Sequence, residues 1–237
     1  MNKGYDAYHF PRYAFVLKLL AAGGVSKTTR VLDIGGSTLT ALIRERFEIA
    51  VDTLGFGADA TGADGRHFEF DLNLVQEKPR WRRDLPRYDV VVMAEVIEHL
   101  HTAPELVLAF VRTLVADNGT LILQTPNAAA LPKRIKSLFG RNPNERIRLD
   151  TSDPGHFREY TLSELREIAS AAGFEVRKTF TDFYFDARFA HHVEGRERRE
   201  PVVGALKNAI YRSLPGSMRE GITLQLTPRS SAATLLQ

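Results

Sequence analysis

Two glutamates and a histidine follow the most apolar stretch of the sequence. The stretch 88–94 reads Tyr-Asp-Val-Val-Val-Met-Ala and predicts a central strand, after which Glu95, Glu98 and His99 come at once. If these residues begin a helix, their i, i+3, i+4 spacing brings the three side chains to one helix face. Two carboxylates and an imidazole can bind a hard divalent ion or act as the base for a hydroxyl nucleophile. A capping and packing role is the alternative, and the pattern leaves it open.

A second stretch suited to ligand binding lies at 31–39 and reads Val-Leu-Asp-Ile-Gly-Gly-Ser-Thr-Leu. Its apolar residues predict a strand buried on both faces. Gly35 and Gly36 allow backbone angles closed to other residues, and a hydroxyl from Ser37 or its neighbour can cap the helix that follows. Such a turn places amide hydrogens beside a crevice at the end of a parallel strand. The Gly-x-Gly-x-x-Gly pattern of dinucleotide folds is missing, and Asp33 favours a ligand with a cationic amino group.

Acids occur at the ends of two further predicted strands, which span 47–52 and 67–73. An acid at the tip of the second strand, Asp52, can accept hydrogen bonds from both hydroxyls of a ribose. The third strand ends in Asp71. Because the carboxyl ends of parallel strands meet along one edge of a sheet, we expect the carboxylates of Asp33, Asp52 and Asp71 to lie close together. This predicts a nucleoside site without naming the nucleoside.

The stretch 31–39 resembles the first motif of the class I S-adenosylmethionine (SAM)-dependent methyltransferases, which reads roughly Val-Leu-Asp-Ile-Gly-Cys-Gly-Thr-Gly. Asp33 and Gly35 match this motif, whereas Ser37 and Leu39 stand where the family usually has its second and third glycines. The resemblance covers roughly residues 5–228 and implies that Asp71 receives the adenine amino group. It implies a SAM site formed by Asp33, Gly35, Gly36, Ser37, Asp52, Asp71, Leu72 and Ala94.

Later segments resemble the same family. The stretch 119–127 resembles its fifth-strand motif, which places Thr125 and Asn127 at the crevice. The stretch 155–161, Gly-His-Phe-Arg-Glu-Tyr-Thr, is characteristic of small-molecule methyltransferases. The Glu-x-x-Glu-His pattern with a later histidine is similar to the metal-binding pattern of ubiquinone-pathway O-methyltransferases and small-RNA 2′-O-methyltransferases. The resemblance implies His156, His99 and Glu98 as catalytic groups, and Glu95, Glu98, His99 and His156 as ligands of Mg²⁺ or Mn²⁺.

Elements that position these residues alternate between strand and helix along the chain. We expect an α/β protein with a Rossmann-like, seven-stranded, mostly parallel sheet, helices on both faces and an antiparallel last strand, as the resemblance implies. The amino-terminal segment is read either as a lid or as a helix packed on the sheet; as a lid it offers Tyr5, His9 and Arg12 for contact. We expect a helical lid segment at 1–30, a methyltransferase domain at 31–228 with a cap insertion at about 128–155 and a helical insertion at about 186–220, and a flexible tail at 229–237.

The amino-acid composition limits where the protein can be located and which partners it can bind. The 237 residues include no cysteine, which excludes disulfides, thiol catalysis and cysteine-ligated zinc. No apolar run is long enough to span a bilayer and no secretory pattern opens the chain, so we expect a soluble, cytoplasmic protein. The net charge is only +3, but bases gather in three clusters, which are either solvated surface or contacts to a phosphate-bearing substrate, an anionic membrane or RNA. The clusters are Arg80, Arg82, Arg83 and Arg87; Lys133, Arg134, Lys136, Arg141, Arg146 and Arg148; and Arg196, Arg198 and Arg199.

The sequence therefore predicts a SAM-dependent methyltransferase that acts on a small-molecule hydroxyl, such as that of a sugar, a natural product or a quinone-like compound. Transfer to oxygen needs alignment and proton removal, which the histidines can supply. One alternative is an RNA 2′-O-methyltransferase with a divalent metal, although no RNA-binding module is evident. Another is a SAM-binding relative without catalysis, because Ser37 and Leu39 replace glycines. A nicotinamide oxidoreductase is disfavoured by the missing glycine pattern.

Overall fold

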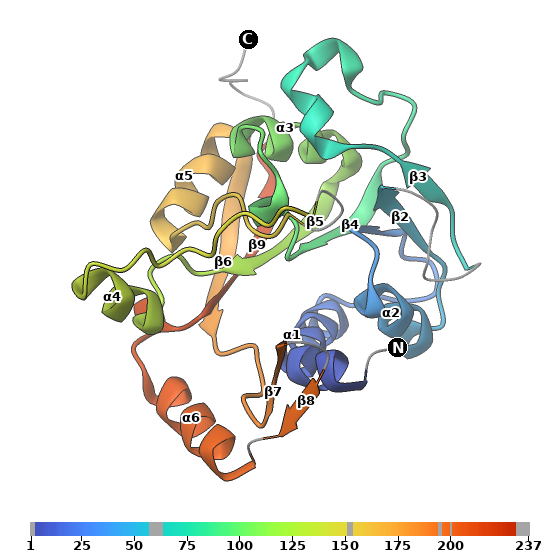
Figure 1. Cartoon of the computed structure of the whole chain (residues 1–237). Coiled ribbons are helices and arrows are strands. Elements are labelled where there is room, and N and C mark those ends of the chain that lie inside the picture. The colour runs from blue at the N-terminus through green and yellow to red at the C-terminus, as the bar shows by residue number, and fades with distance from the viewer. Residues whose placement is uncertain (1–2, 57–63, 151–153, 194–195, 200, 231–237) are drawn as a thin grey trace.

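The computed structural model describes residues 3–56, 64–150, 154–193, 196–199 and 201–230. A seven-stranded sheet with the strand order β3-β2-β1-β4-β5-β9-β6 forms its centre (Figure 1). The strands are β1 (Val31–Ile34), β2 (Val51–Gly55), β3 (His67–Glu69), β4 (Tyr88–Ala94), β5 (Val115–Pro126), β6 (Phe174–Asp182) and β9 (Gly221–Pro228).

Pairing within the sheet confirms the predicted fold class. β1 pairs in parallel with β2 and β4, and β4 pairs in parallel with β5. The last strand, β9, is antiparallel to both of its neighbours, β5 and β6. The carboxyl ends of β1, β2, β3, β4 and β5 therefore meet at one edge, where a Rossmann-like sheet binds its ligands.

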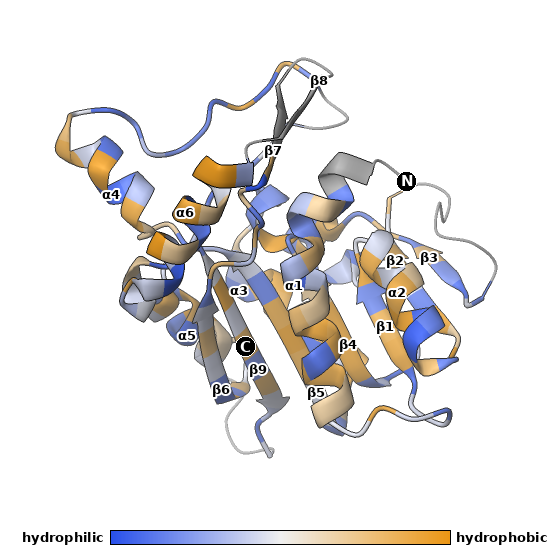
Figure 2. Ribbon diagram, turned by 90° about the horizontal axis from the view of Figure 1, so that it is seen from below, coloured by the Kyte–Doolittle hydropathy of each residue, from blue (hydrophilic) through white to orange (hydrophobic). Residues whose placement is uncertain are grey.

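Helices cover both faces of the sheet, as Figure 2 shows. On one face lie α1 (Lys3–Ala22) and α2 (Thr38–Phe47), and on the other lie α3 (Pro104–Leu114) and α5 (Leu162–Ala171). Alternate residues of β1 supply the two cores: Val31 packs with α1 and α2, and Leu32 packs with α3 and α5. Three of the four residues of β1 are apolar, as expected of a strand buried on both faces, which is why this run was readable from the sequence.

Two predicted strand boundaries are wrong, and one of them changes the site. The strand predicted at 67–73 is shorter, because β3 covers only His67–Glu69 and Asp71 lies after its end. The second strand begins at Val51, because Phe47 is still the last residue of α2 and Glu48 ends that helix in the left-handed region at φ 53°. An alternating pattern at 47–52 was thus shared between a helix end and a strand start.

Segments outside the main sheet complete the described structure. The predicted cap contains α4 (Leu131–Leu138). The predicted helical insertion also contains a hairpin of β7 (Phe189–Val193) and β8 (Arg196–Arg199) before α6 (Pro201–Ser213). Short 3₁₀ helices are η1 (Leu72–Gln76), η2 (Lys78–Arg80), η3 (Ile97–His99) and η4 (Gly216–Met218). Among the described residues, no helix has the length and apolar character needed to cross a bilayer.

Candidate functional site

A glycine turn joins β1 to α2. Gly35 has a φ of 81°, a left-handed conformation that side chains disfavour. Ser37 then caps α2, as predicted: its hydroxyl accepts a hydrogen bond from the Leu39 N–H at 3.2 Å, and its own N–H donates to Thr40 Oγ1 at 2.9 Å. The first N–H groups of a helix carry partial positive charge, so this turn suits a carboxylate or another anionic ligand group.

The glycine turn lies directly against the loop that follows β4. A Cβ atom on Gly35 would lie only 2.6 Å from Val96 Cγ2. Gly36 is less constrained, since its Cβ would lie 3.3 Å from the Thr53 side chain. The residue at position 35 must therefore be glycine for packing as well as for backbone geometry, and the turn is fixed next to the segment that carries Glu98 and His99.

Asp33 lies inside the protein beneath this turn. Only 2% of its surface is exposed, and its carboxyl accepts a hydrogen bond of 2.5 Å from the Thr40 hydroxyl. Burial raises the pKa of Asp33 to about 7, against the lowering effect of that hydrogen bond and of two arginines. Through Thr40, Asp33 ties the start of α2 to β1 and so supports the turn from below.

The prediction that Asp52 closes the second strand is wrong. Asp52 is the second residue of β2, which runs on to Gly55. Its carboxylate accepts hydrogen bonds of 2.8 Å from the Arg66 N–H, the Arg66 guanidinium and the Tyr88 hydroxyl. Burial acts to raise its pKa, but these bonds outweigh burial, and the net shift is downward.

The expected convergence of three carboxylates is wrong for the same reason. In the sheet Asp52 lies level with Leu32, whereas Asp33 lies level with Thr53. Successive residues of a strand point to opposite faces, so the carboxylates of Asp33 and Asp52 lie on opposite faces of the sheet. At the end of β2 the chain instead presents Gly55 and an exposed phenylalanine.

The remaining predicted cofactor residues lie near the carboxyl edge of the sheet, with different exposures. Asp71 follows β3 and caps η1, accepting a hydrogen bond of 2.8 Å from the Asn73 N–H. Leu72, which the resemblance places in the SAM site, is buried in the core. Ala94 is the half-buried last residue of β4.

Glu98, His99 and His156 come together although they lie far apart in the sequence. Within the described part of the chain they form the group that can hold a metal ion, with one ligand atom of each within 4.8 Å of the others. The two imidazole rings are nearly perpendicular, with centroids 4.7 Å apart. A backbone hydrogen bond of 2.8 Å, from the Phe157 N–H to the Glu98 carbonyl, joins the two segments.

Glu98 is fully buried at the base of this cluster. Its Oε2 accepts a hydrogen bond of 2.9 Å from the Thr125 hydroxyl. Its Oε1 is buried and has no hydrogen-bond partner among the residues that the structure describes. Burial, followed by the neighbouring Glu95, raises the pKa of Glu98 well above the usual value. A buried carboxylate in this position would be stabilised by a cation or by a hydroxyl group of a ligand.

Hydrogen bonds orient both histidines in the same way. Nδ1 of His99 lies 3.0 Å from the Gly155 carbonyl oxygen, and Nδ1 of His156 lies 3.0 Å from Glu159 Oε1. A neutral imidazole that donates from Nδ1 carries its lone pair on Nε2. Burial, and then the neighbouring His99, lower the pKa of His156 to about 4, so that His156 is neutral at pH 7 and able to accept a proton.

Contrary to the prediction, Glu95 lies outside the cluster of Glu98, His99 and His156. The residues after β4 form the three-residue η3 and not an α-helix, and Glu95 itself has a left-handed φ of 56°. The i, i+3, i+4 spacing therefore does not apply. The Glu95 carboxylate faces α1, where Oε2 lies 3.8 Å from Arg12 Nη1. Burial raises the pKa of Glu95.

Of the predicted lid residues, His9 and Arg12 are buried in α1, and the Tyr5 side chain lies outside the described residues. Asn127, predicted to face the crevice, is buried: its amide donates a hydrogen bond of 2.8 Å to the Arg219 carbonyl. Its Oδ1 accepts a hydrogen bond of 2.9 Å from the Ala129 N–H. Asn127 therefore holds backbone in place.

Lys133 and Glu159 are site residues that the sequence did not reveal. The Lys133 ammonium forms an ion pair with Glu159, the residue that holds His156. Burial lowers the pKa of Lys133 to about 8. Lys133 belongs to a cluster of bases for which the sequence left both solvated surface and ligand contact open, and the fold shows that this one turns inward to Glu159.

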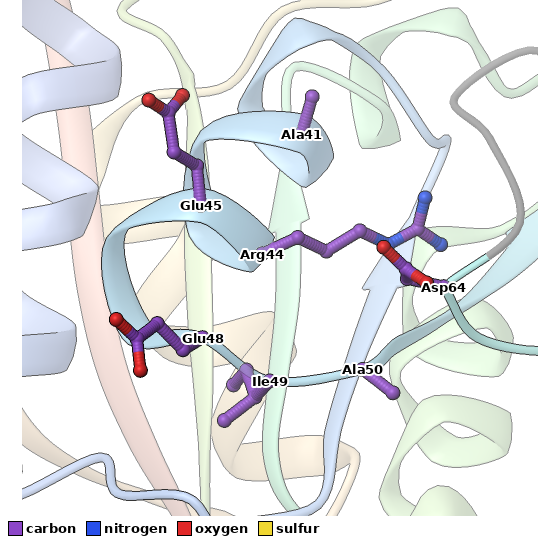
Figure 3. A pocket seen from close by; sticks show the side chains of 7 residues that line it. All are labelled: Ala41, Arg44, Glu45, Glu48, Ile49, Ala50 and Asp64. Atoms are coloured by element: carbon purple, nitrogen blue, oxygen red, sulfur yellow. The ribbon is translucent and has the colours of Figure 1, made fainter.

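The structure also has a hollow of about 490 Å³ beside the end of α2 (Figure 3). It lies at the amino-terminal end of β2, on the opposite edge of the sheet from the glycine turn, and is unrelated to the cluster. Arg44 crosses it and donates a hydrogen bond of 2.6 Å to the Val51 carbonyl. Its lining residues are Ala41, Arg44, Glu45, Glu48, Ile49, Ala50 and Asp64.

Comparison with solved structures finds the same fold in methyltransferases. A SAM-dependent methyltransferase from Archaeoglobus fulgidus is 17% identical with a TM-score of 0.55, covering 91% of this chain and 94% of that chain. A complex of the Haloferax volcanii Trm112 methyltransferase activator with a proposed methyltransferase is 13% identical with a TM-score of 0.62, covering 98% of this chain and 94% of that chain. A Burkholderia thailandensis 1,6-didemethyltoxoflavin-N1-methyltransferase with bound S-adenosylhomocysteine is 16% identical with a TM-score of 0.53, covering 95% of this chain and 85% of that chain. At these identities the likeness establishes the fold alone.

Sequence comparison with the curated proteins finds no match. A family model described as "Methyltransferase domain" matches residues 5–179, which is most of the chain and includes the glycine turn and the Glu98, His99 and His156 cluster. The chain belongs to this methyltransferase-domain family and is a methyltransferase.

Proposed function

We propose that this enzyme transfers a methyl group from SAM to a hydroxyl group of a small molecule. The observation that carries the proposal is the contact between the glycine turn and the loop after β4: Gly35 lies against Val96, and Glu98 and His99 follow within three residues. A ligand held on the turn is thereby adjacent to a buried acid and imidazole cluster. SAM supplies the electrophilic methyl group on its sulfonium.

The residues at the carboxyl edge fit SAM in part. The turn of Gly35, Gly36 and Ser37 offers a helix amino terminus for the methionine carboxylate. Asp71 is half-buried after β3 at the same edge, which supports its proposed contact with the adenosine end. Asp52 does not fit the ribose, because its carboxylate is committed to Arg66 and Tyr88. Support for SAM also comes from the Burkholderia relative, which binds S-adenosylhomocysteine.

The acceptor hydroxyl is assigned to the side of the turn where His156 lies. Neutral His156 accepts the hydroxyl proton at Nε2 while its Nδ1–H donates to the Glu159 carboxylate. Glu159 stabilises the positive imidazole that results, and the Lys133 ammonium pairs with the same carboxylate. The oxygen then bonds to the methyl carbon as the sulfur–carbon bond breaks, and sulfur keeps the electron pair. The protein contributes alignment and proton removal.

The test is transfer of a labelled methyl group from SAM to a panel of small hydroxyl compounds. The expected result is label on oxygen, with His156→Ala slowing transfer by about 10²- to 10⁴-fold. His101→Ala is the matched control, because His101 is exposed on the same loop and outside the cluster. Label found only on nitrogen or carbon, or equal rates for both variants, would refute the proposal.

A second candidate is metal-assisted methylation of an RNA 2′-hydroxyl. Oε1 of Glu98 has no hydrogen-bond partner in the described part of the chain, and the ligand atoms lie within 4.8 Å of one another. Both observations favour a bound Mg²⁺ or Mn²⁺ with Glu98, His99 and His156 as its ligands. Titration with Mn²⁺ followed by electron paramagnetic resonance tests it. Binding that is lost in Glu98→Gln and kept in Glu105→Gln, together with salt-dependent binding of RNA oligomers, would support this function over the first.

A further inference from the structure

Helix α6 packs against the protein through its polar and small residues. Its buried residues are Gly204 and Asn208, four positions apart. A Cβ atom on Gly204 would lie 2.4 Å from the Ala187 carbonyl oxygen, so the helix approaches the backbone as closely as glycine permits. Asn208 accepts a hydrogen bond of 3.0 Å from the Ala187 N–H and donates one of 2.9 Å to Asp186. The contacts of Gly204 and Asn208 thus fix which face of α6 lies against the protein.

The outward face of α6 is apolar. Val202, Leu206 and Ile210 recur every four residues and form one exposed stripe, with Val203 beside it. Leu206, in the middle of the stripe, has 63% of its surface exposed. A helix on a water-soluble surface normally shows the reverse arrangement, with its apolar stripe against the core. The arrangement in α6 is that of a helix whose outer face meets an apolar phase.

Helix α4 and the loop after it show the same property. Ile135, Leu138 and Phe139 are exposed, Leu138 by 80%, and Ile147 and Leu149 follow them. In Figures 1 and 2, α4 and α6 both lie on the side of the molecule away from α2, β2 and β3. Two helices of the same side therefore present large apolar side chains to the surroundings.

Positive charge accompanies these apolar residues. Segments 131–149 and 201–219 together carry nine lysines and arginines, one of them the inward-turned Lys133, against one acid, Glu145, although the whole chain has a net charge of only +3. Lys136, Arg141 and Lys207 are among the exposed bases. A second copy of the same surface would repel it, and nucleic acid offers nothing apolar for the leucines. Anionic lipid supplies both the negative charge and the apolar phase.

We propose that the surface formed by residues 131–149 and α6 docks on an anionic membrane, with the leucines, isoleucines and Phe139 entering the headgroup boundary. This membrane-docking surface is independent of the proposed reaction. It is also consistent with the position of α4, which carries Leu138 outward and Lys133 inward over the cluster.

The test is co-sedimentation of the full chain with vesicles of phosphatidylcholine, with and without phosphatidylglycerol, at low salt. Binding is expected only to the anionic vesicles. Leu206→Gln with Ile210→Gln should weaken it by about tenfold or more, as should Lys207→Glu with Arg212→Glu. Phe10→Gln and Arg83→Glu, which alter an exposed apolar and an exposed basic residue elsewhere, should leave binding unchanged.

All four variants change exposed side chains, so retention of the wild-type unfolding midpoint is expected and is measured alongside. Failure of the wild type to bind anionic vesicles would overturn the proposal, as would equal binding by the Leu206 and Phe10 variants. Sedimentation velocity is the final arm: a dimer that dissociates on Leu206→Gln would assign the surface to a second copy and also overturn it.

Discussion

His156 meets His99 edge to face, with ring centroids 4.7 Å apart. Two hydrogen bonds to the backbone keep them together, one from Phe157 to Glu98 and one between His99 and Gly155. The cluster is therefore built by the loop before α5 folding onto the loop after β4. It does not depend on one face of a helix, which the Glu-x-x-Glu-His spacing had suggested.

Glu159 should position His156 for proton removal. Glu159→Gln removes the negative charge opposite Nδ1, and we expect kcat to fall about tenfold with KM nearly unchanged. Glu164→Gln is the control, because Glu164 is a nearby glutamate that belongs to the capping box of α5 and not to the cluster. Steady-state kinetics with the best acceptor from the hydroxyl panel provide the measurement. Equal kcat values for the two variants would show that Glu159 has no role in the reaction.

Gly35 should tolerate no side chain. Gly35→Ala forces a Cβ atom into Val96 at a left-handed backbone, and we expect it to lower the free energy of unfolding by about 1–3 kcal/mol more than Gly24→Ala. Gly24 also has a left-handed φ, 76°, but no atom within 4 Å of the added Cβ, so it isolates the cost of the contact. Urea unfolding of both variants is the measurement, and equal midpoints would contradict the packing described for the turn.

Asp33 should make stability depend on pH. Its folded pKa of about 7 exceeds its ordinary value of 3.8, so the folded state holds the proton more tightly and stability falls as pH rises between these values. From pH 5 to pH 8 this amounts to about 2–3 kcal/mol. Asp33→Asn keeps an acceptor for Thr40 without the charge, and should lose this dependence. Urea unfolding of both proteins at pH 5 and 8 decides the matter; parallel pH profiles would show that Asp33 titrates normally.

Asp52 should contribute to stability and not to cofactor binding. Asp52→Ala leaves the Tyr88 hydroxyl and Arg66 without their partner, at a cost of about 1–3 kcal/mol. Its lowered pKa means that this contribution is present above pH 4 and is lost as pH falls further. Asp84→Ala removes a comparable but exposed pair with Arg82 and should change the unfolding midpoint little. A loss of S-adenosylhomocysteine binding in Asp52→Ala, measured where the variant is folded, would contradict this assignment.

The fold was predictable because its signals are local. The central strand 88–94 is apolar apart from Asp89, and the capping residue Ser37 is recognisable by its type. The association of Glu98 and His99 with His156 could be anticipated only from the family resemblance, since 57 positions separate His99 from His156. No periodicity carries information over that distance.

Two of the errors originate in the backbone conformation of a single residue, and a third originates in a contact between distant parts of the chain. The position of Asp52 within β2 depends on where α2 ends. Glu48 ends α2 with a left-handed backbone, which cannot be predicted from a glutamate. Glu95 also has a left-handed backbone after β4, and its side chain lies toward Arg12. Lys133 faces inward because Glu159 comes from another part of the chain.

Calorimetric titration with S-adenosylhomocysteine tests the central claim most directly, because it needs no acceptor. The wild-type chain should bind one molecule, Gly35→Ala should bind it at least about tenfold more weakly, and Asp52→Ala should bind it like the wild type. Absence of binding to the folded wild-type chain, or weaker binding in Asp52→Ala with none lost in Gly35→Ala, would contradict a SAM site built on the glycine turn.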